Sequence, residues 1–247
     1  MPPKYNFEKI KFATDPGTFE KAVKLYEDKK IVDFKEEFGN YTAVVLGGKP
    51  YKVFVYGRSY EMGSCECYLG QNNYHCKHMV AVAIRACLKG KKIDEEDKEI
   101  ISGPVCSEIL GELSKGEITG IKKFISDALR YIKSYNGPSR RWFAYQGSLS
   151  EGCARLSVVV SKLPISEQTA TLLVDLLLRL DKKLCAGGVD DSEGTVGGFM
   201  GEVVEMLQEY VKLDPSCVKA FKKLCSQSTC FGWEEPLVRM FDERDVL

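Results

Sequence analysis

The chain has 247 residues, of which 44% are hydrophobic and 28% charged, proportions typical of a globular protein. Lys and Arg number 35 and Asp and Glu number 35, so the formal net charge is zero, whereas a dedicated nucleic-acid binder usually has a basic excess. No apolar run approaches the roughly 18 residues of a membrane span, and the N-terminus lacks an apolar signal region. We therefore expect an intracellular protein, located in the cytoplasm or in the nucleus or nucleoid, with no membrane contact.

The first element is predicted as a helix over residues 15–28. Asp15 is a suitable N-cap, and Pro16 occupies the first helical position. Three strands are expected next, over residues 31–38, 40–46 and 52–56, and the glycines between them favour hairpin turns. The first part of the chain should therefore contain a small three-stranded antiparallel β-meander.

The most informative segment is Cys65-Glu-Cys67, followed after eight residues by Cys76-Lys-His78. Three thiolates and one imidazole complete the closed tetrahedron of a structural Zn²⁺ site and leave no position for a catalytic water. The apolar period of residues 77–88 predicts a helix with Cys76 at its N-terminus and His78 in its first turn. The spacing thus predicts one structural zinc ion held by Cys65, Cys67, Cys76 and His78.

Other interpretations of this segment explain less of its pattern. Cysteines are often small buried hydrophobes, and a C-x-C pair can be a redox site, but neither accounts for the C-x-H pair that follows. The chain has two histidines, His75 and His78, and both lie here. His75 could replace His78 as the ligand, although it precedes the predicted helix and breaks the C-x-H spacing.

The C-x-C-x8-C-x-H pattern, with strands before it and a helix carrying the last ligands, resembles the SWIM-type zinc finger. The resemblance covers about residues 40–90, and the matching positions are Cys65, Cys67, Cys76 and His78. It implies zinc binding, together with DNA or protein binding in diverse contexts, and it implies no single activity. Motifs of the helicase-like, transposase-like or recombination-related partners of this module are not visible in the sequence.

The finger domain is expected over residues 1–90, a linker over 91–104 and an α-helical domain over 105–247. Helices are predicted over residues 117–135, 140–163, 167–184 and 195–211, with another starting at 214–215 and a last one over 233–242. A strand around residues 158–160 is the alternative within the second of these. The predicted fold class is α+β: the β-meander with a zinc knuckle and helix, then a helical bundle or irregular helical repeat.

The helical part contains an acidic loop and a cluster of basic and aromatic residues. The loop Asp190-Asp191-Ser192-Glu193-Gly194 could bind a cation, but it lacks the full calcium-loop spacing and is better explained as a solvated turn before a helix. Basic and aromatic residues could hold single-stranded nucleic acid, although an ordinary solvated face with core aromatics is favoured. These residues are Lys122, Arg130, Lys133, Arg140, Arg141, Trp142, Phe143 and Tyr145.

The remaining cysteines show no second metal pattern and are expected to be free, mostly buried thiols. They are Cys106, Cys153, Cys185, Cys217, Cys225 and Cys230. Without a secretion signal, a chain with ten cysteines favours a reducing compartment.

Residues 1–90 carry 14 basic and 10 acidic side chains, whereas residues 91–247 carry 21 and 25. This mild asymmetry permits binding of nucleic acid, DNA first and RNA second, by the finger domain. The candidate phosphate contacts are Lys49, Lys52, Arg58, Lys77 and Arg85. The alternative is a protein-interaction adaptor with a helical docking domain. An enzyme is not expected, because nucleotide-binding and hydrolase motifs are missing and both histidines lie in the zinc segment.

Overall fold

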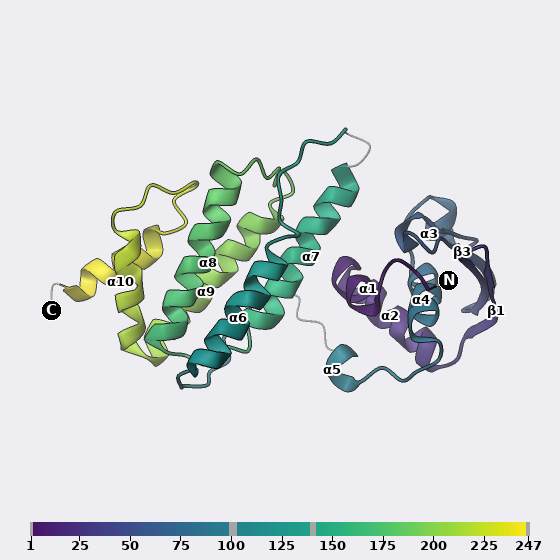
Figure 1. The fold of residues 1–247 in the computed structure, drawn as a ribbon, viewed down its shortest axis with the longest axis horizontal. Coiled ribbons are helices and arrows are strands. Elements are labelled where there is room, and N and C mark those ends of the chain that lie inside the picture. The colour runs from purple at the N-terminus through teal and green to yellow at the C-terminus, as the bar shows by residue number, and fades with distance from the viewer. Residues whose placement is uncertain (1, 99–102, 139–141, 246–247) are drawn as a thin grey trace. The chain divides into compact units, whose positions relative to one another are not determined.

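The computed structural model describes residues 2–98, 103–138 and 142–245. The chain divides into two compact units, residues 1–100 and 101–247 (Figure 1). Unit 1 contains α1 (Phe7–Ala13), α2 (Pro16–Glu27), β1 (Ile31–Glu37), β2 (Asn40–Leu46), β3 (Pro50–Val55), η1 (Tyr60–Met62), β4 (Ser64–Cys65), α3 (Tyr68–Gln71), α4 (Lys77–Leu88) and α5 (Glu95–Lys98). Unit 2 contains α6 (Lys115–Ala128), α7 (Trp142–Val160), α8 (Glu167–Cys185), α9 (Thr195–Leu213), η3 (Pro215–Leu224) and α10 (Glu235–Asp245).

The sheet of unit 1 is antiparallel in the order β1-β2-β3-β4 and has four strands. The predicted three-stranded meander therefore lacked one strand of the sheet. The fourth strand, β4, is two residues long and pairs Cys65 with Val53 of β3. A strand this short has no readable alternation in the sequence, yet its pairing places the first cysteine against the sheet.

Helix α4 lies between the sheet and α2 (Figure 1). The residues from His78 to Ile84 are all buried, which is why α4 is apolar on nearly every side. Helix α2 begins as predicted, with the Asp15 carboxylate accepting a hydrogen bond from the Thr18 N–H at 2.9 Å. The core of unit 1 thus fixes the start of α4, where two of the predicted ligands lie.

The segment after α4 packs on unit 1. Ile93 is buried in its core, the Tyr26 hydroxyl donates to the Lys91 carbonyl oxygen at 2.6 Å, and Lys98 forms an ion pair with Glu27. Residues 91–98 therefore belong to unit 1, where the sequence favoured a linker. Residues 99–102 of that expected linker lie outside the described residues.

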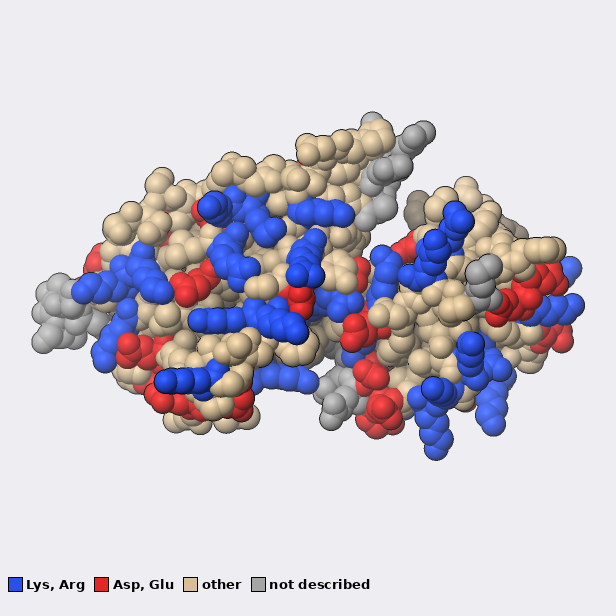
Figure 2. Space-filling view, in the orientation of Figure 1, with Lys and Arg blue, Asp and Glu red and all other residues tan. Residues whose placement is uncertain are grey.

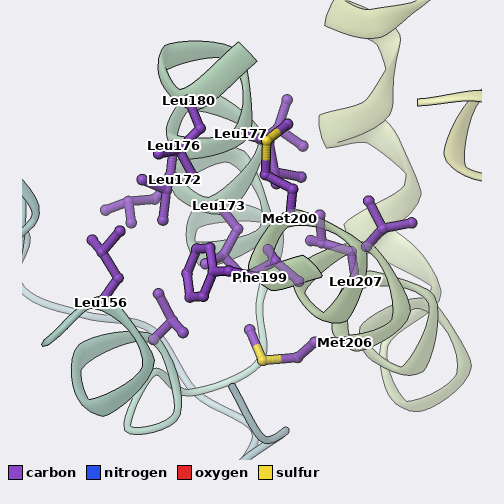
Figure 3. Close-up of a cluster of buried hydrophobic side chains, with 14 of the residues drawn as sticks. Leu156, Leu172, Leu173, Leu176, Leu177, Leu180, Phe199, Met200, Met206 and Leu207 are labelled. Atoms are coloured by element: carbon purple, nitrogen blue, oxygen red, sulfur yellow. The ribbon is translucent and has the colours of Figure 1, made fainter. Parts of the chain in front are cut away.

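Unit 2 is built from helices around one apolar core. Leucines of α8 interdigitate with Phe199, Met200 and Leu207 of α9, and Leu156 of α7 joins them (Figure 3). Residues 158–160 belong to α7, so the helical prediction there is confirmed and the strand alternative is wrong.

Helix α6 ends at Ala128, earlier than the predicted residue 135. The Tyr135 N–H, which a longer helix would pair with the Tyr131 carbonyl oxygen, donates instead to the Gly188 carbonyl oxygen at 2.9 Å. The carbonyl oxygens of Ile132 and Lys133 accept from the Lys183 ammonium group and the Tyr145 hydroxyl. These tertiary contacts satisfy the backbone without a helix, and periodicity alone cannot reveal them.

The expectation of free thiols is wrong for two of the six cysteines of unit 2, because a disulfide joins Cys185 to Cys230. The other four are free, and Cys153 and Cys217 are buried while Cys225 is exposed.

Candidate metal centre

Four side chains converge at one buried point of unit 1. Cys65 comes from β4, Cys67 precedes α3, Cys76 is the N-cap of α4, and His78 lies in the first turn of α4. Their ligand atoms all lie within 4.8 Å of one another, and none of the four residues is more than 7% exposed. Three sulfurs and one nitrogen at this spacing make a group that could hold one metal ion.

Backbone amides support the sulfur atoms. The Cys67 N–H donates to the Cys65 Sγ atom at 3.5 Å, and the Gly70 N–H donates to the Cys67 Sγ atom at 3.4 Å. Gly70 has no room for a side chain, because a Cβ atom there would lie 2.3 Å from the Cys65 carbonyl oxygen. The tight turn from Cys65 through Cys67 into α3 therefore depends on a glycine at position 70.

The imidazole of His78 is fixed from both sides. Its Nδ1 atom faces the sulfurs, at 3.6 Å from Cys65 and 3.9 Å from Cys76. The Tyr51 ring stacks on the imidazole with centroids 4.7 Å apart. A Cβ atom on Gly47 would lie 3.4 Å from Nε2, so the β2–β3 turn closes over the opposite edge of the ring. This packing leaves Nδ1 as the metal-facing atom.

The protonation of the cluster shows why it suits a cation. The hydrogen bond with Cys65 lowers the pKa of Cys76 to about 3, and the same hydrogen bond raises the pKa of Cys65. Without metal, Cys76 is therefore the thiolate of this pair and Cys65 keeps its proton. A divalent cation would replace that proton and allow every sulfur to bind as a thiolate. The donor set and its burial fit tetrahedral Zn²⁺.

The alternative ligand, His75, is not part of this group. Its ring packs on Tyr60 with centroids 5.1 Å apart, and burial lowers the pKa of His75. Its Nε2 atom is buried without a hydrogen-bond partner among the described residues. His75 therefore contributes to the packing beside the cluster, and the geometry gathers His78 with the cysteines.

The five candidate phosphate contacts do not form one patch. Lys49 lies in the β2–β3 turn with its ammonium group 5.6 Å from the Tyr51 ring centroid, and Lys77 is adjacent to both Cys76 and His78 in sequence. These two lysines therefore lie beside the metal centre. Lys52 is exposed on the face of β3 opposite that of Val53, and Arg58 follows the far end of β3.

Arg85 lies near the C-terminal end of α4, where its guanidinium group packs 5.5 Å from the centre of the Phe34 ring. It lines a hollow of about 570 Å³ together with Tyr26, Lys29, Lys91 and Lys92. Glu27 and Glu95 also line this hollow, and both form ion pairs with Lys98. The sequence did not predict that Lys29, Lys91 and Lys92 lie close to Arg85. They come together because α2 packs against α4.

The acidic loop of unit 2 is held by the protein itself. The Asp191 carboxylate accepts hydrogen bonds from the N–H groups of Val196 and Gly197 at the start of α9. Asp190 accepts from the Trp142 indole N–H and from Ser192, and the Ser192 contact lowers the pKa of Asp190. These bonds favour the loop as a cap of α9 over a cation site.

The predicted basic and aromatic cluster of unit 2 is only partly described. Arg140 and Arg141 lie outside the described residues, as does the Phe143 side chain. Tyr145 packs against Tyr135 with centroids 4.6 Å apart, which supports a core role for this aromatic residue. Arg130 is exposed and pairs with Asp127. On the face in view in Figure 2, basic and acidic side chains are interspersed over each unit.

Comparison with known proteins does not assign the chain to a family. No family model matches the chain, and no curated protein or solved structure is significantly similar to it. Among the described residues, no helix is both long and apolar enough to cross a membrane. The candidate function therefore depends on the geometry of the metal centre and its surroundings.

Proposed function

We propose that this protein is a non-enzymatic, zinc-binding, SWIM-like finger protein that binds nucleic acid through unit 1, with DNA as the first candidate. Zn²⁺ would be held by Cys65, Cys67, Cys76 and His78 in a closed tetrahedron. Four protein ligands leave no coordination position for a reacting water, so the metal would serve the fold rather than a reaction.

The observation that carries the proposal is the layered arrangement of Lys49, Tyr51 and His78. The Lys49 ammonium group lies over the Tyr51 ring, and the ring stacks on the imidazole of the metal centre. Lys77 begins the helix at the same end of the unit. A rigid centre with two lysines beside it could position phosphate contacts that a flexible hairpin would not hold.

Exposed aromatic side chains near the cysteines add support. Tyr68 is 80% exposed in α3, and Tyr74 is 66% exposed in the loop before α4. Aromatic rings beside cations are the usual platform for unstacked bases, so single-stranded nucleic acid should be among the ligands tested.

A second candidate is the protein-interaction adaptor, which exposed apolar residues of unit 2 favour. Val105, Ile109 and Leu110 are each more than 60% exposed in the extended segment before α6. Apolar side chains exposed together are a usual feature of protein-binding surfaces. In this alternative, the zinc centre would only support the fold of unit 1.

Fluorescence anisotropy with single-stranded DNA, duplex DNA and RNA tests the proposal across a salt series on the zinc-loaded full chain. We expect binding that weakens steeply with salt. The double variant Lys49→Glu, Lys77→Glu should weaken binding and reduce the slope of log affinity against log salt by about 2, because each lost phosphate contact removes about one unit. The control is Lys115→Glu, Lys123→Glu, which reverses two exposed charges on α6 and should change little.

Absence of binding at low salt would reject the nucleic-acid proposal and direct attention to protein partners of unit 2. An equal loss in both double variants would also contradict it, because binding would then depend on overall charge and not on the zinc-centre lysines.

A further inference from the structure

The cysteine pair of unit 2 carries an inference independent of the metal centre. We propose that Cys185 and Cys230 form a reversible disulfide, that low-molecular-weight disulfides modify Cys185 first, and that the bond fastens the C-terminal segment of residues 225–245 to α8. The two Cα atoms are 6.0 Å apart, within the range that a disulfide requires. Cys225 is exposed and lies only five residues before Cys230, yet it is free. The pairing is therefore selective.

The Asp181 carboxylate explains the selectivity. Asp181 lies one helical turn before Cys185 on α8 and is only 8% exposed. Its Oδ1 atom accepts hydrogen bonds from the Cys230 backbone N–H and from the Trp233 indole N–H, both at 2.8 Å. These bonds do not require the disulfide, so they would keep Cys230 within reach of Cys185 in the reduced protein as well.

The same contacts favour a disulfide over a second metal site. Asp181, Cys185 and Cys230 lie close enough together for their ligand atoms to be considered as a metal group. However, Oδ1 of Asp181 already accepts two N–H donors of the protein itself. Once reduced, the Cys185 thiol can donate to the Oδ2 atom of Asp181, which lies 3.6 Å from its sulfur.

The order of reaction follows from exposure. Cys185 is exposed at the C-terminal end of α8, whereas Cys230 is partly buried. The Cys185 thiolate would attack a small disulfide such as oxidised glutathione, form a mixed disulfide and release one glutathione thiolate. The Cys230 thiolate would then attack the Cys185 sulfur and release the second glutathione thiolate. Two thiol protons are transferred to the two leaving thiolates, so one protein disulfide and two reduced glutathione molecules result.

The Cys185–Cys230 disulfide would constrain the C-terminal segment of unit 2, residues 225–245. The loop after Cys230 contains two residues in the left-handed region, Phe231 and Gly232, and leads directly into α10. Among the residues of α10 whose burial is described, Leu237 is fully buried in the core, and Val238, Met240 and Phe241 pack against the core while partly exposed. The disulfide adds a covalent constraint to a segment whose other core contacts are mostly partly buried, so its reduction should loosen residues 225–245 while the α8–α9 core stays intact.

The test equilibrates the full chain with a series of oxidised-to-reduced glutathione ratios, blocks free thiols with an alkylating reagent and maps the peptides by mass spectrometry. We expect a cross-linked peptide pair containing Cys185 and Cys230 that disappears at reducing ratios. Cys230→Ser should accumulate glutathione on Cys185, whereas Cys185→Ser should leave Cys230 much less modified. Cys225→Ser should form the cross-link as the parent chain does.

Hydrogen exchange on the oxidised and reduced forms supplies the structural readout. Faster exchange confined to residues 225–245 on reduction would support the proposal. Three results would overturn it: no cross-link at any ratio, a cross-link that persists at the most reducing ratio, or glutathione found on Cys230 before Cys185. Circular dichroism of each variant distinguishes these outcomes from unfolding.

Discussion

The aromatic ring of Tyr51 stacks on the imidazole of His78, with centroids 4.7 Å apart and the ring planes inclined by 29°. The stack connects β3 with the first turn of α4, so the sheet orients a candidate metal ligand. Tyr51→Leu should loosen this orientation and lower zinc affinity about tenfold, the lower end of what groups supporting a metal ligand contribute.

Competition with a chromophoric chelator measures this affinity. The matched control is Tyr68→Leu, which removes an 80% exposed ring close to the same cysteines and should leave zinc affinity unchanged. Equal affinities of the parent and the Tyr51 variant would show that the stack does not orient His78.

Replacement of one sulfur ligand tests the assignment of the cluster. Cys76→Ser should abolish stoichiometric zinc binding and leave residues 40–90 unfolded or loosely packed, because structural zinc contributes about 10 kcal/mol of binding free energy to such small modules. Zinc content and hydrogen exchange report the two effects. Cys87→Ser is the control, since Cys87 lies on the same helix and its thiol donates to the Tyr5 carbonyl oxygen, a bond that serine can also make. A Cys76 variant with full zinc content would contradict the assignment.

Gly70 gives a steric test of the turn. A methyl group at this position would lie 2.3 Å from the Cys65 carbonyl oxygen, so Gly70→Ala must displace the cysteine backbone and should lower the melting temperature and the zinc affinity. Gly48→Ala adds the same atoms where nothing lies within 4 Å of them and should be nearly neutral. The test compares the melting temperatures of the two variants with that of the parent chain. A Gly70→Ala variant as stable as the parent would show that the turn has another geometry.

The pH dependence of zinc binding follows from the shared proton of the cluster. The hydrogen bond with Cys76 raises the pKa of Cys65, so this thiol keeps its proton at neutral pH in the absence of metal, whereas Cys76, with a pKa of about 3, is already a thiolate. Zinc must displace the Cys65 proton. Affinity should therefore rise with pH, by up to about tenfold per pH unit for each displaced proton.

Calorimetry in buffers of different ionisation enthalpy would count the released protons at neutral pH. We expect at least one proton per zinc. An affinity that does not change with pH, with no proton release, would contradict the protonation scheme.

The acidic loop before α9 should act as a helix cap. Asp191→Ala removes the acceptor of the Val196 and Gly197 N–H groups and should lower the free energy of unfolding by about 1 kcal/mol, as loss of an N-cap usually does. Addition of Ca²⁺ should leave the melting temperature of the parent chain unchanged. A calcium-dependent increase that Asp191→Ala abolishes would instead identify a cation site.

The predictable part of the metal centre was its ligand set, because soft donors at close sequence spacing limit the chemistry to a few outcomes. The structure gathers Cys65, Cys67, Cys76 and His78 at one point, as the spacing predicted. Helices with strong apolar periods, such as α8 and α9, were also predictable, because burial of one face dictates their pattern.

The structural features that could not be predicted from the sequence depend on contacts between segments far apart in the chain. The pairing of β4 with β3 involves two residues and leaves no periodic signal. The stack of Tyr51 on His78 depends on how the sheet packs against α4, and the Cys185–Cys230 bond joins residues 45 positions apart. Each results from tertiary packing, which local propensity does not encode.

X-ray absorption at the zinc edge of the full chain tests the central claim most directly, namely that Cys65, Cys67, Cys76 and His78 hold one structural zinc ion. Native mass spectrometry first establishes the stoichiometry. The prediction is one zinc per chain with three sulfur ligands at about 2.3 Å and one nitrogen ligand at about 2.0 Å. A chain that binds no zinc, or a zinc whose first shell contains oxygen in place of sulfur, would contradict the account.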